Sequence, residues 1–277
     1  MYGINIYMRQ NIAQRESEAL LQSMQAEAQS IEQSNENLLA PKDASEGNVL
    51  SEVSGNECGQ PEETLPPAVP NPYAESFAAN KDMAGWLKID GTPIDYPIMW
   101  TPGDETYYLY KNFEGKDDQN GCLLLDTDSS LDPLTTNLII HGHNMKNGDM
   151  FGTLTDYTDP NYCKEHNIIT LHTQDTERRY EVVAVFRSQV YRKTDTVFKF
   201  YKFFQADTQE EFDDFYQNIK ALSLYDTGVT AQFGDRFITL STCVYHVERG
   251  RFVVVAKEIE PGNRYLPLGE QDSNNLH

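Results

Sequence analysis

Two runs of β-branched and apolar residues near the end of the chain limit most strongly what it can fold into. Residues 235–243 and 251–258 both have the composition of β-strands, and the second run has that of a buried strand. The seven residues between Cys243 and Arg251, 244–250, are few enough for a hairpin connection. Cys243 therefore ends one strand and Arg251 begins its neighbour, so a thiol and a guanidinium are expected to face each other across one end of a sheet.

A histidine follows a third apolar strand. The run expected as a strand at 136–141 leads into Gly142, which lets the backbone turn so that His143 can project from a loop. Cysteine reacts as the thiolate, and a nearby imidazolium or arginine stabilises that form. Arginine stays charged, so Arg251 suits a developing oxyanion or a bound peptide carbonyl better than proton transfer. His143, Cys243 and Arg251 are therefore the candidate catalytic residues.

Three segments around these residues resemble the signature blocks of the sortases, and in particular of the class B sortases of Gram-positive cell surfaces. Their order and spacing together make a specific signal, which any one of them alone would not. The likeness covers about 73–260 of the chain, nearly all of its expected ordered part. The three blocks and two further upstream segments are 137–154, 239–243, 251–257, 85–98 and 107–115.

The resemblance implies a reaction and a role for each residue. Cys243 would be the nucleophile of a cysteine transpeptidase, with His143 and Arg251 as the family's histidine and arginine. Such an enzyme cleaves a C-terminal sorting motif of a secreted protein after threonine, through a thioester, and transfers the protein to an amine of a cell-wall precursor. No cofactor and no metal are expected. Ser241 lies on the strand face of Cys243 by the period of two, and we expect Ser241 and Thr242 to bind substrate.

Several alternatives stay open. Arg249 lies two residues before Arg251 and could face the same way. Arg251 is preferred because it stands directly before the apolar run 252–256. A hydrolytic cysteine protease is disfavoured because the papain-like order of cysteine before histidine is absent. Two further hypotheses are a non-catalytic surface barrel that binds a ligand and a sortase that polymerises pilins.

Two patterns could indicate metal binding, and both are weak. His141 and His143 have the spacing of two ligands on one strand face, but no matching cysteine or carboxylate pattern accompanies them. Asp126, Asp128 and Asp132 lack the glycine and the terminal glutamate of an EF-hand loop. We expect the aspartates in a solvated turn, and the role of His141 stays open.

The pattern predicts a mostly β fold, which the resemblance specifies as a closed eight-stranded sortase-type β-barrel with flanking helices. One helix is expected at 73–84, and a second at 208–222, where Thr208 and Glu211 form a capping-box pattern. A long helix just before the cysteine strand is, by the resemblance, a mark of class B. The strands are expected at 85–89, 94–99, 121–126, 136–141, 167–172, 179–191, 235–243 and 251–258.

Composition divides the chain into four parts. Residues 28–71 contain eight Asp or Glu residues against Lys42 alone and are poor in aromatic residues, as in disordered linkers. The expected division is a helix-prone juxtamembrane segment at 1–27, an acidic disordered linker at 28–72, a sortase catalytic domain at 73–262 and a flexible tail at 263–277.

The net charge of −21 argues against nucleic acid as a partner, because phosphate binding needs clustered Lys and Arg.

The first residues of the chain bear on its attachment to a membrane. The apolar start of the chain is too short to cross a bilayer, which needs about 20 residues. Class B sortases usually carry an N-terminal membrane anchor, so we expect this chain to begin inside or just after one, on the outer face of a Gram-positive membrane. A soluble amphipathic segment at the start of the chain is the alternative.

If Cys243 is the nucleophile, the other cysteines (58, 122 and 163) allow at most one disulfide, and we expect none.

Overall fold

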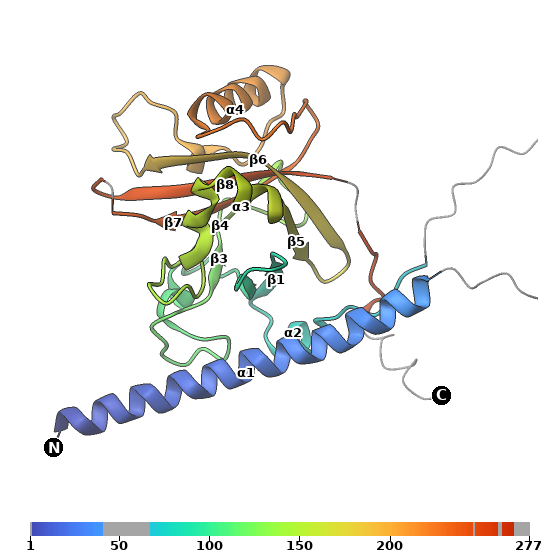
Figure 1. Cartoon of the computed structure of the whole chain (residues 1–277), viewed down its shortest axis with the longest axis vertical. Coiled ribbons are helices and arrows are strands. Elements are labelled where there is room, and N and C mark those ends of the chain that lie inside the picture. Colours follow the sequence, from blue (N-terminus) through green and yellow to red (C-terminus); the bar gives the residue numbers. More distant parts are fainter. Residues whose placement is uncertain (1, 41–66, 246, 260–261, 269–277) are drawn as a thin grey trace, which may run out of the picture.

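The computed structural model describes residues 2–40, 67–245, 247–259 and 262–268. Its eight strands close into a barrel in the order β1-β2-β3-β4-β7-β8-β6-β5 (Figure 1), which confirms the predicted fold class. The strands are β1 Met83–Lys88, β2 Asp95–Met99, β3 Leu123–Leu125, β4 Asn137–Gly142, β5 Ile168–His172, β6 Glu177–Gln189, β7 Phe237–Cys243 and β8 Gly250–Glu258.

Helices lie outside the barrel. One expected helix, 73–84, is shorter than predicted, because Asn80 ends it: its side-chain amide donates to the carbonyl of Phe113 (2.6 Å) and its side-chain oxygen accepts from the Asp82 amide. The chain then enters β1 directly. The helices are α1 Tyr2–Leu39, α2 Ala74–Ala79, α3 Pro160–Glu165 and α4 Gln209–Leu222, with 3-10 turns η1 Tyr107–Tyr110, η2 Gly152–Thr158 and η3 Phe200–Lys202.

The strands near the end of the chain are buried on both faces. On β7, Ile238 and Leu240 point into the barrel and join its interior core, while Phe237 points outward. On β8, Val253 likewise points outward, between residues that face the interior. Alternating side chains of a strand face opposite sides of a sheet, so each of these strands needs a cover on the outside as well.

The helix α4 is that cover. Its capping box forms as predicted: the Thr208 hydroxyl accepts from the Glu211 amide (3.3 Å), and the Glu211 carboxylate accepts from the Thr208 amide (3.1 Å). The buried face of α4, with Phe212 and Phe215, packs on Phe237 of β7. The helix therefore lies over β6, β7 and β8 on one outer face of the barrel (Figure 1).

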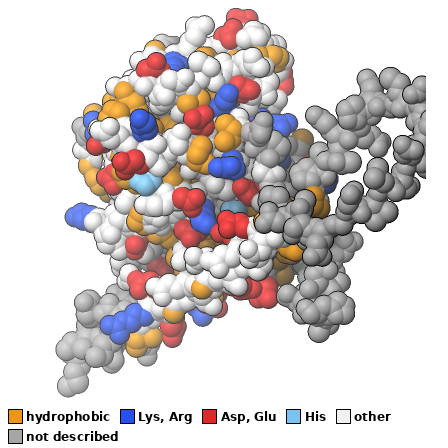
Figure 2. Space-filling view, turned by 45° about the vertical axis from the view of Figure 1, so that its right-hand side comes forward, with side chains coloured by type: hydrophobic (Ala, Val, Ile, Leu, Met, Phe, Trp, Pro, Cys, Tyr) orange, Lys and Arg blue, Asp and Glu red, His pale blue; other side chains and the backbone are white. Residues whose placement is uncertain are grey.

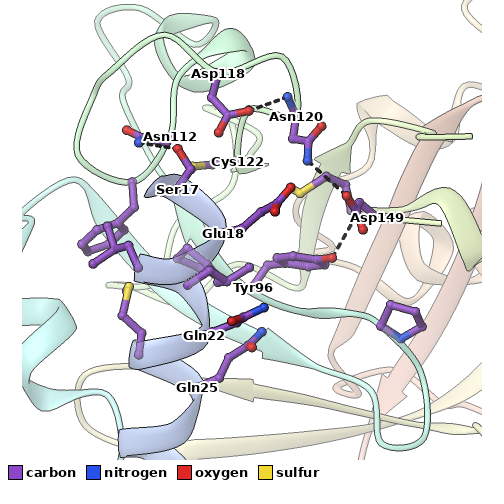
Figure 3. A pocket seen from close by; sticks show the side chains of 18 of the residues that line it. Ser17, Glu18, Gln22, Gln25, Tyr96, Asn112, Asp118, Asn120, Cys122 and Asp149 are labelled. Carbon is purple, nitrogen blue, oxygen red and sulfur yellow. Dashed lines mark hydrogen bonds between the residues drawn. The ribbon is translucent and has the colours of Figure 1, made fainter. Parts of the chain in front are cut away.

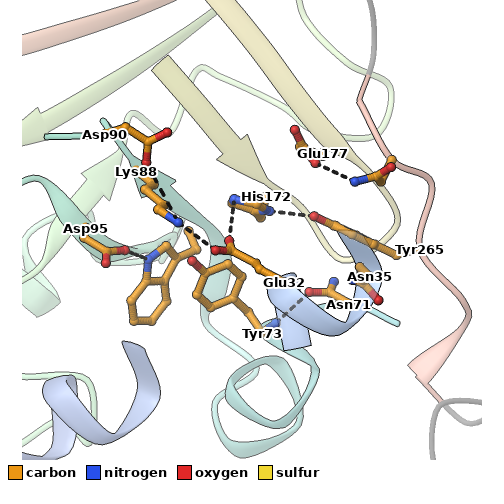
Figure 4. Close-up of polar contacts among 12 residues, drawn as sticks. Glu32, Asn35, Asn71, Tyr73, Lys88, Asp90, Asp95, His172, Glu177 and Tyr265 are labelled. Atoms are coloured by element: carbon orange, nitrogen blue, oxygen red, sulfur yellow. Dashed lines mark hydrogen bonds and ion pairs between the residues drawn. The ribbon is translucent and has the colours of Figure 1, made fainter. Parts of the chain in front are cut away.

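The helix α1 covers another outer face, at β1 to β3. Its Met24 and Ala28 pack in one cluster with Trp86 of β1 and Leu124 of β3. Further along α1, the Glu32 carboxylate lies 2.7 Å from the Lys88 ammonium (Figure 4). Among the described residues no helix combines the length and the apolar character that a membrane span requires.

Two expected boundaries differ from the structure. Residues 28–39, which composition placed in the disordered linker, are helical because they contact the folded part of the chain: Glu32 lies 2.7 Å from Lys88 of β1, and Asn35 donates to the carbonyl of Pro70 (2.9 Å). The tail was expected to begin at 263, yet Tyr265 is buried and pairs with Val69 in a short β-bridge. The middle of the linker, 41–66, and the end of the tail, 269–277, lie outside the described residues, and the rest of the domain division stays a prediction.

Candidate active site

The pairing of β4 with β7 brings the histidine to the cysteine. These strands run parallel, and Gly142 is the register partner of Thr242. The next residue on each chain, His143 and Cys243, therefore leaves the sheet at the same end and at the same level. The antiparallel pairing of β7 with β8 then places Arg251 directly opposite Cys243. The three predicted residues stand at neighbouring positions along one end of the sheet, with the cysteine in the middle.

The side chains of this strand end face two different sides. Cys243 is exposed, and Ser241, two residues earlier, lies on the same outer face but is 1% exposed. The Ser241 hydroxyl has no hydrogen-bond partner among the described residues. Thr242 faces the barrel interior, where its hydroxyl donates to the carbonyl of Gly142 (2.7 Å). This hydroxyl ties β7 to β4 and points away from the face that carries Cys243, and the expected part of Thr242 in substrate binding stays a prediction.

Gly142 is needed for a different reason from the one expected. Its backbone is not in the left-handed region, so the turn into His143 does not itself require glycine. A Cβ at this position would lie 2.6 Å from side-chain atoms of both Leu123 and Phe151, which is well inside contact distance. Glycine is therefore needed for the close approach of the β4 end to its neighbours.

The imidazole of His143 has two partners that sequence reasoning did not name. Its Nε2 lies 2.8 Å from the carbonyl oxygen of Leu109, and since a carbonyl only accepts, Nε2 carries the hydrogen. The ring of Tyr110 lies against the imidazole, with 5.3 Å between the ring centroids. Nδ1 is therefore the ring nitrogen that is left to exchange a proton. Leu109 and Tyr110 stand in a block that resembled the family, but nothing in their residue types marks them as partners of a histidine.

The two candidate arginines occupy different surroundings. Arg251 is a strand residue of β8, half-buried, and one of its guanidinium nitrogens donates to the carbonyl of Gly250 (3.1 Å). Arg249 lies in the connection with φ of 56°, is exposed, and is no strand partner of Cys243. The register therefore favours Arg251 as the arginine beside the thiol.

His141, whose role the sequence left open, pairs with one of the aspartates. Its Nε2 lies 3.1 Å from a carboxylate oxygen of Asp126. Burial by itself would raise the pKa of Asp126, but hydrogen bonds from His141 and from the Asp128 amide outweigh it and hold that pKa below its ordinary value. Among the described residues no cluster of potential ligands is suited to a metal ion.

The described cysteines differ in what surrounds them. Cys122, Cys163 and Cys243 are all unpaired, and Cys58 lies outside the described residues. Burial, with a contribution from Asp118, raises the pKa of the Cys122 thiol to about 12, and burial also raises the pKa of Cys163. Both buried thiols are therefore held in the unreactive protonated form. Cys243 differs from them in being exposed at the sheet end, beside a histidine and an arginine.

Comparisons with known proteins identify the family of this fold and site. A model of the sortase domain matches residues 87–259. Sortase B of Listeria monocytogenes is 36% identical over 180 residues, which are 64% of this chain and 70% of that protein. Sortase B of Staphylococcus aureus is 30% identical over 186 residues, or 65% of this chain and 72% of that one.

Solved structures agree with the sequence matches. A Staphylococcus aureus sortase B–substrate complex superposes with a TM-score of 0.61 at 27% identity, covering 68% of this chain and 85% of that one. Sortase B from Bacillus anthracis superposes with a TM-score of 0.60 at 30% identity, covering 70% and 89%.

A closed β-barrel with a cysteine, a histidine and an arginine at one sheet end defines a sortase-type cysteine transpeptidase. The chain belongs to the sortase family, and its relatives place it in class B. Sortases are cell-surface enzymes of Gram-positive bacteria that act on proteins carrying sorting signals.

Proposed function

We propose that this sortase cleaves a sorting motif near the C-terminus of secreted proteins after threonine and joins the protein to an amine of a cell-wall precursor. The observation that carries the proposal is the register that sets the exposed Cys243 between His143 and Arg251. The solved complex of Staphylococcus aureus sortase B with a substrate supports substrate binding by this fold. No cofactor and no metal enter the reaction.

In the first half of the reaction, the Cys243 thiolate attacks the carbonyl carbon of the threonine. A C–S bond forms, and the carbonyl oxygen becomes an oxyanion that the Arg251 guanidinium stabilises. The scissile C–N bond then breaks, and the imidazolium of His143 gives its proton to the departing amine. Ser241, on the same strand face, lines the floor of the peptide site. The thioester retains the N-terminal part of the substrate.

In the second half, the amine of the wall precursor attacks the thioester carbonyl. His143, now neutral, accepts the proton that the attacking nitrogen loses, and an amide bond forms. The C–S bond breaks and Cys243 leaves as the thiolate, so the imidazolium–thiolate pair is restored. One amide bond is made for each amide bond broken, and the net reaction needs no oxidant and no energy source.

The proposed place of the reaction is the outer face of the cell membrane. The family's usual N-terminal anchor would hold the enzyme where secreted proteins emerge and where wall precursors are displayed. Sequencing the gene upstream and in frame would test the anchor, and a stop codon with no apolar run before it would contradict it.

The test of the reaction uses fluorogenic peptides of Asn-Pro-x-Thr-x and Leu-Pro-x-Thr-Gly type, each with and without an added amine. We expect cleavage after threonine by the wild type, amide formation with the amine, and loss of at least about 10³-fold in Cys243→Ala, as for removal of other catalytic nucleophiles. His143→Ala and Arg251→Ala should also lose activity, while Arg249→Ala serves as the matched control and should retain it.

The outcomes separate the alternatives. Cleavage with water as the sole acceptor would indicate a hydrolytic protease. No cleavage, together with no labelling of Cys243 by a thiol-reactive peptide analogue, would favour a binding barrel. Joining of one protein substrate to a lysine of another would indicate a pilin polymerase. Activity that survives loss of Arg251 but not of Arg249 would reassign the arginine.

A further inference from the structure

We propose that Asn144 is a positioning residue that holds the end of β7, with its nucleophile, at a fixed separation from the catalytic histidine. Its side-chain Nδ2 donates to the backbone carbonyl of Cys243 at 2.8 Å. Asn144 directly follows His143, so one hydrogen bond connects the histidine loop to the main chain of the cysteine itself. The inference rests on the proposed roles of His143 and Cys243.

The bond lies where the regular pairing of the two strands stops. Gly142 and Thr242 are the last register partners of β4 and β7. On its other side, the strand end is still held by β8, where the Val244 amide donates to the carbonyl of Gly250 (3.1 Å). On the β4 side, the side chain of Asn144 supplies the next contact. It therefore extends the β4–β7 connection one step beyond the last backbone pair, to Cys243.

The loop that carries Asn144 is anchored independently at its far end. The Phe151 amide donates to the carbonyl of His143 (2.9 Å), which closes the loop on itself. The Met150 amide donates to the Tyr96 hydroxyl (3.2 Å). The Asp149 carboxylate accepts from the side chain of Asn120 (3.2 Å), as Figure 3 shows. A loop held in this way moves as a unit, so a contact at Asn144 also constrains His143.

The chemistry makes this separation matter. Proton transfer between the imidazole and the groups on the thioester carbon needs hydrogen-bond distances, and a misplacement of about 1 Å can cost a factor of about 10² in rate. The Asn144 contact is a single neutral hydrogen bond at an exposed position, so its loss should allow partial misplacement. We expect a fall of about tenfold in kcat, with KM changed by less than about twofold, because the peptide site itself is intact.

The variants are Asn144→Ala, which removes the donor, and Asn144→Asp, which keeps the shape but places an oxygen against the Cys243 carbonyl. The matched control is Asn218→Ala on α4, another exposed contact in which an asparagine amide donates to a backbone carbonyl (Asp214, 2.7 Å). Both Asn144 variants should lose kcat with thermal midpoints within about 2 °C of wild type, because exposed polar contacts contribute little to stability. The control should keep its kcat.

A second measurement separates a positioning role from a merely structural one and does not depend on the sorting peptide. The rate of Cys243 alkylation by iodoacetamide is measured in Asn144→Ala, in His143→Ala and in the double variant. If Asn144 acts through the histidine–cysteine pair, its substitution slows alkylation severalfold in the wild-type background and has no further effect once His143 is absent.

Three results would overturn the inference while leaving the proposed mechanism in place. They are a kcat of Asn144→Ala within twofold of wild type, a loss that falls wholly on KM, and an equal slowing of alkylation with and without His143. If His143→Ala alone leaves alkylation unchanged, the proposed pair itself fails, and the role of Asn144 fails with it. A failure of Asn144 alone is therefore distinguishable from a failure of the proposed mechanism.

Discussion

The catalytic end of the barrel and the side on which α1 lies are built in different ways. At the catalytic end, backbone pairing of β4, β7 and β8 sets the positions of the functional residues, and the strands behind them are buried on both faces. On the α1 side, one helix is held by a smaller apolar cluster around Met24 and Ala28 together with single polar contacts along its length. A cavity of about 440 Å³ stays open between this helix and the barrel (Figure 3).

The polar contacts of α1 recur along its length. Ser17 accepts from the Asn112 side chain (2.8 Å), and Gln25 donates to the carbonyl of Asp95 (2.8 Å). Further along, Glu32 reaches Lys88 and faces His172, whose Nδ1 bonds the Tyr265 hydroxyl at 2.6 Å (Figure 4).

Each such contact contributes about 1 kcal/mol, whereas a buried apolar side chain contributes about 2–3 kcal/mol. Catalytic geometry therefore depends mainly on the barrel core, whereas attachment of α1 depends also on polar contacts that are sensitive to charge and pH. On the face shown in Figure 2, acidic and basic side chains are interspersed, so substitution of one surface charge away from these contacts should matter little.

The largest expected loss of stability comes from a substitution in the barrel core. Leu240→Ala removes a fully buried side chain from β7 at the centre of the interior core, and should lower the free energy of unfolding by about 3–4 kcal/mol. Met24→Ala, at the α1 interface, is the comparison and should cost about 1–2 kcal/mol, because Met24 is 9% exposed and packs beside a cavity. Urea denaturation measures the free energy of unfolding of both variants. Equal losses would show that the barrel core and the α1 interface contribute alike to stability.

A smaller loss of stability is expected on the α1 side when the pH is lowered. Burial, with a contribution from Lys88, lowers the pKa of His172 to about 3, so at neutral pH it is uncharged and its approach to Glu32 (3.8 Å) is not an ion pair. The unfolded state binds the proton near the ordinary value of about 6.5, so stability is complete above that pH and falls as pH decreases towards 3. Between pH 7 and pH 5 the loss from this group should be about 2 kcal/mol.

The measurement is the free energy of unfolding at pH 7 and at pH 5, in wild type and in His172→Phe. The variant lacks the titrating group, so the part of the pH dependence that belongs to His172 should disappear from it. An unchanged slope in the variant would assign the acid sensitivity to other groups. Cys243 alkylation at pH 7 should be the same in both proteins, because His172 lies on β5, away from the catalytic end.

The smallest loss of stability is expected when the ion pair between α1 and β1 is removed. The Glu32 and Lys88 side chains are 23% and 27% exposed, and although burial opposes it, the contact with Glu32 raises the pKa of Lys88. Glu32→Gln keeps the shape and removes the charge, and should cost about 1 kcal/mol of stability at low salt, and less at high salt. Transpeptidase activity should stay within about twofold of wild type. A large loss of activity would show that attachment of α1 controls the catalytic end.

Much of the barrel could be predicted because its strands carry local signals. The runs before Cys243 and after Arg251 form β7 and β8, and the capping box of Thr208 with Glu211 begins α4, as predicted. The helix expected at 73–84 was too long because its end depends on contacts of Asn80 with a segment distant in sequence. The extent of α1 was wrong for the same kind of reason, since composition does not record what a helix packs against.

The sequence by itself determined which segments become strands and which residue types could form a thiol–imidazole–guanidinium site, because propensity and periodicity act over a few neighbouring residues. Only the tertiary structure decided that β4 pairs in parallel with β7, so that His143 stands beside Cys243, and that Thr242 faces the barrel interior. It also decided the contacts of Leu109 with His143 and of Asn144 with Cys243. These contacts join residues far apart along the chain, and they exist only once the closed sheet has fixed the register.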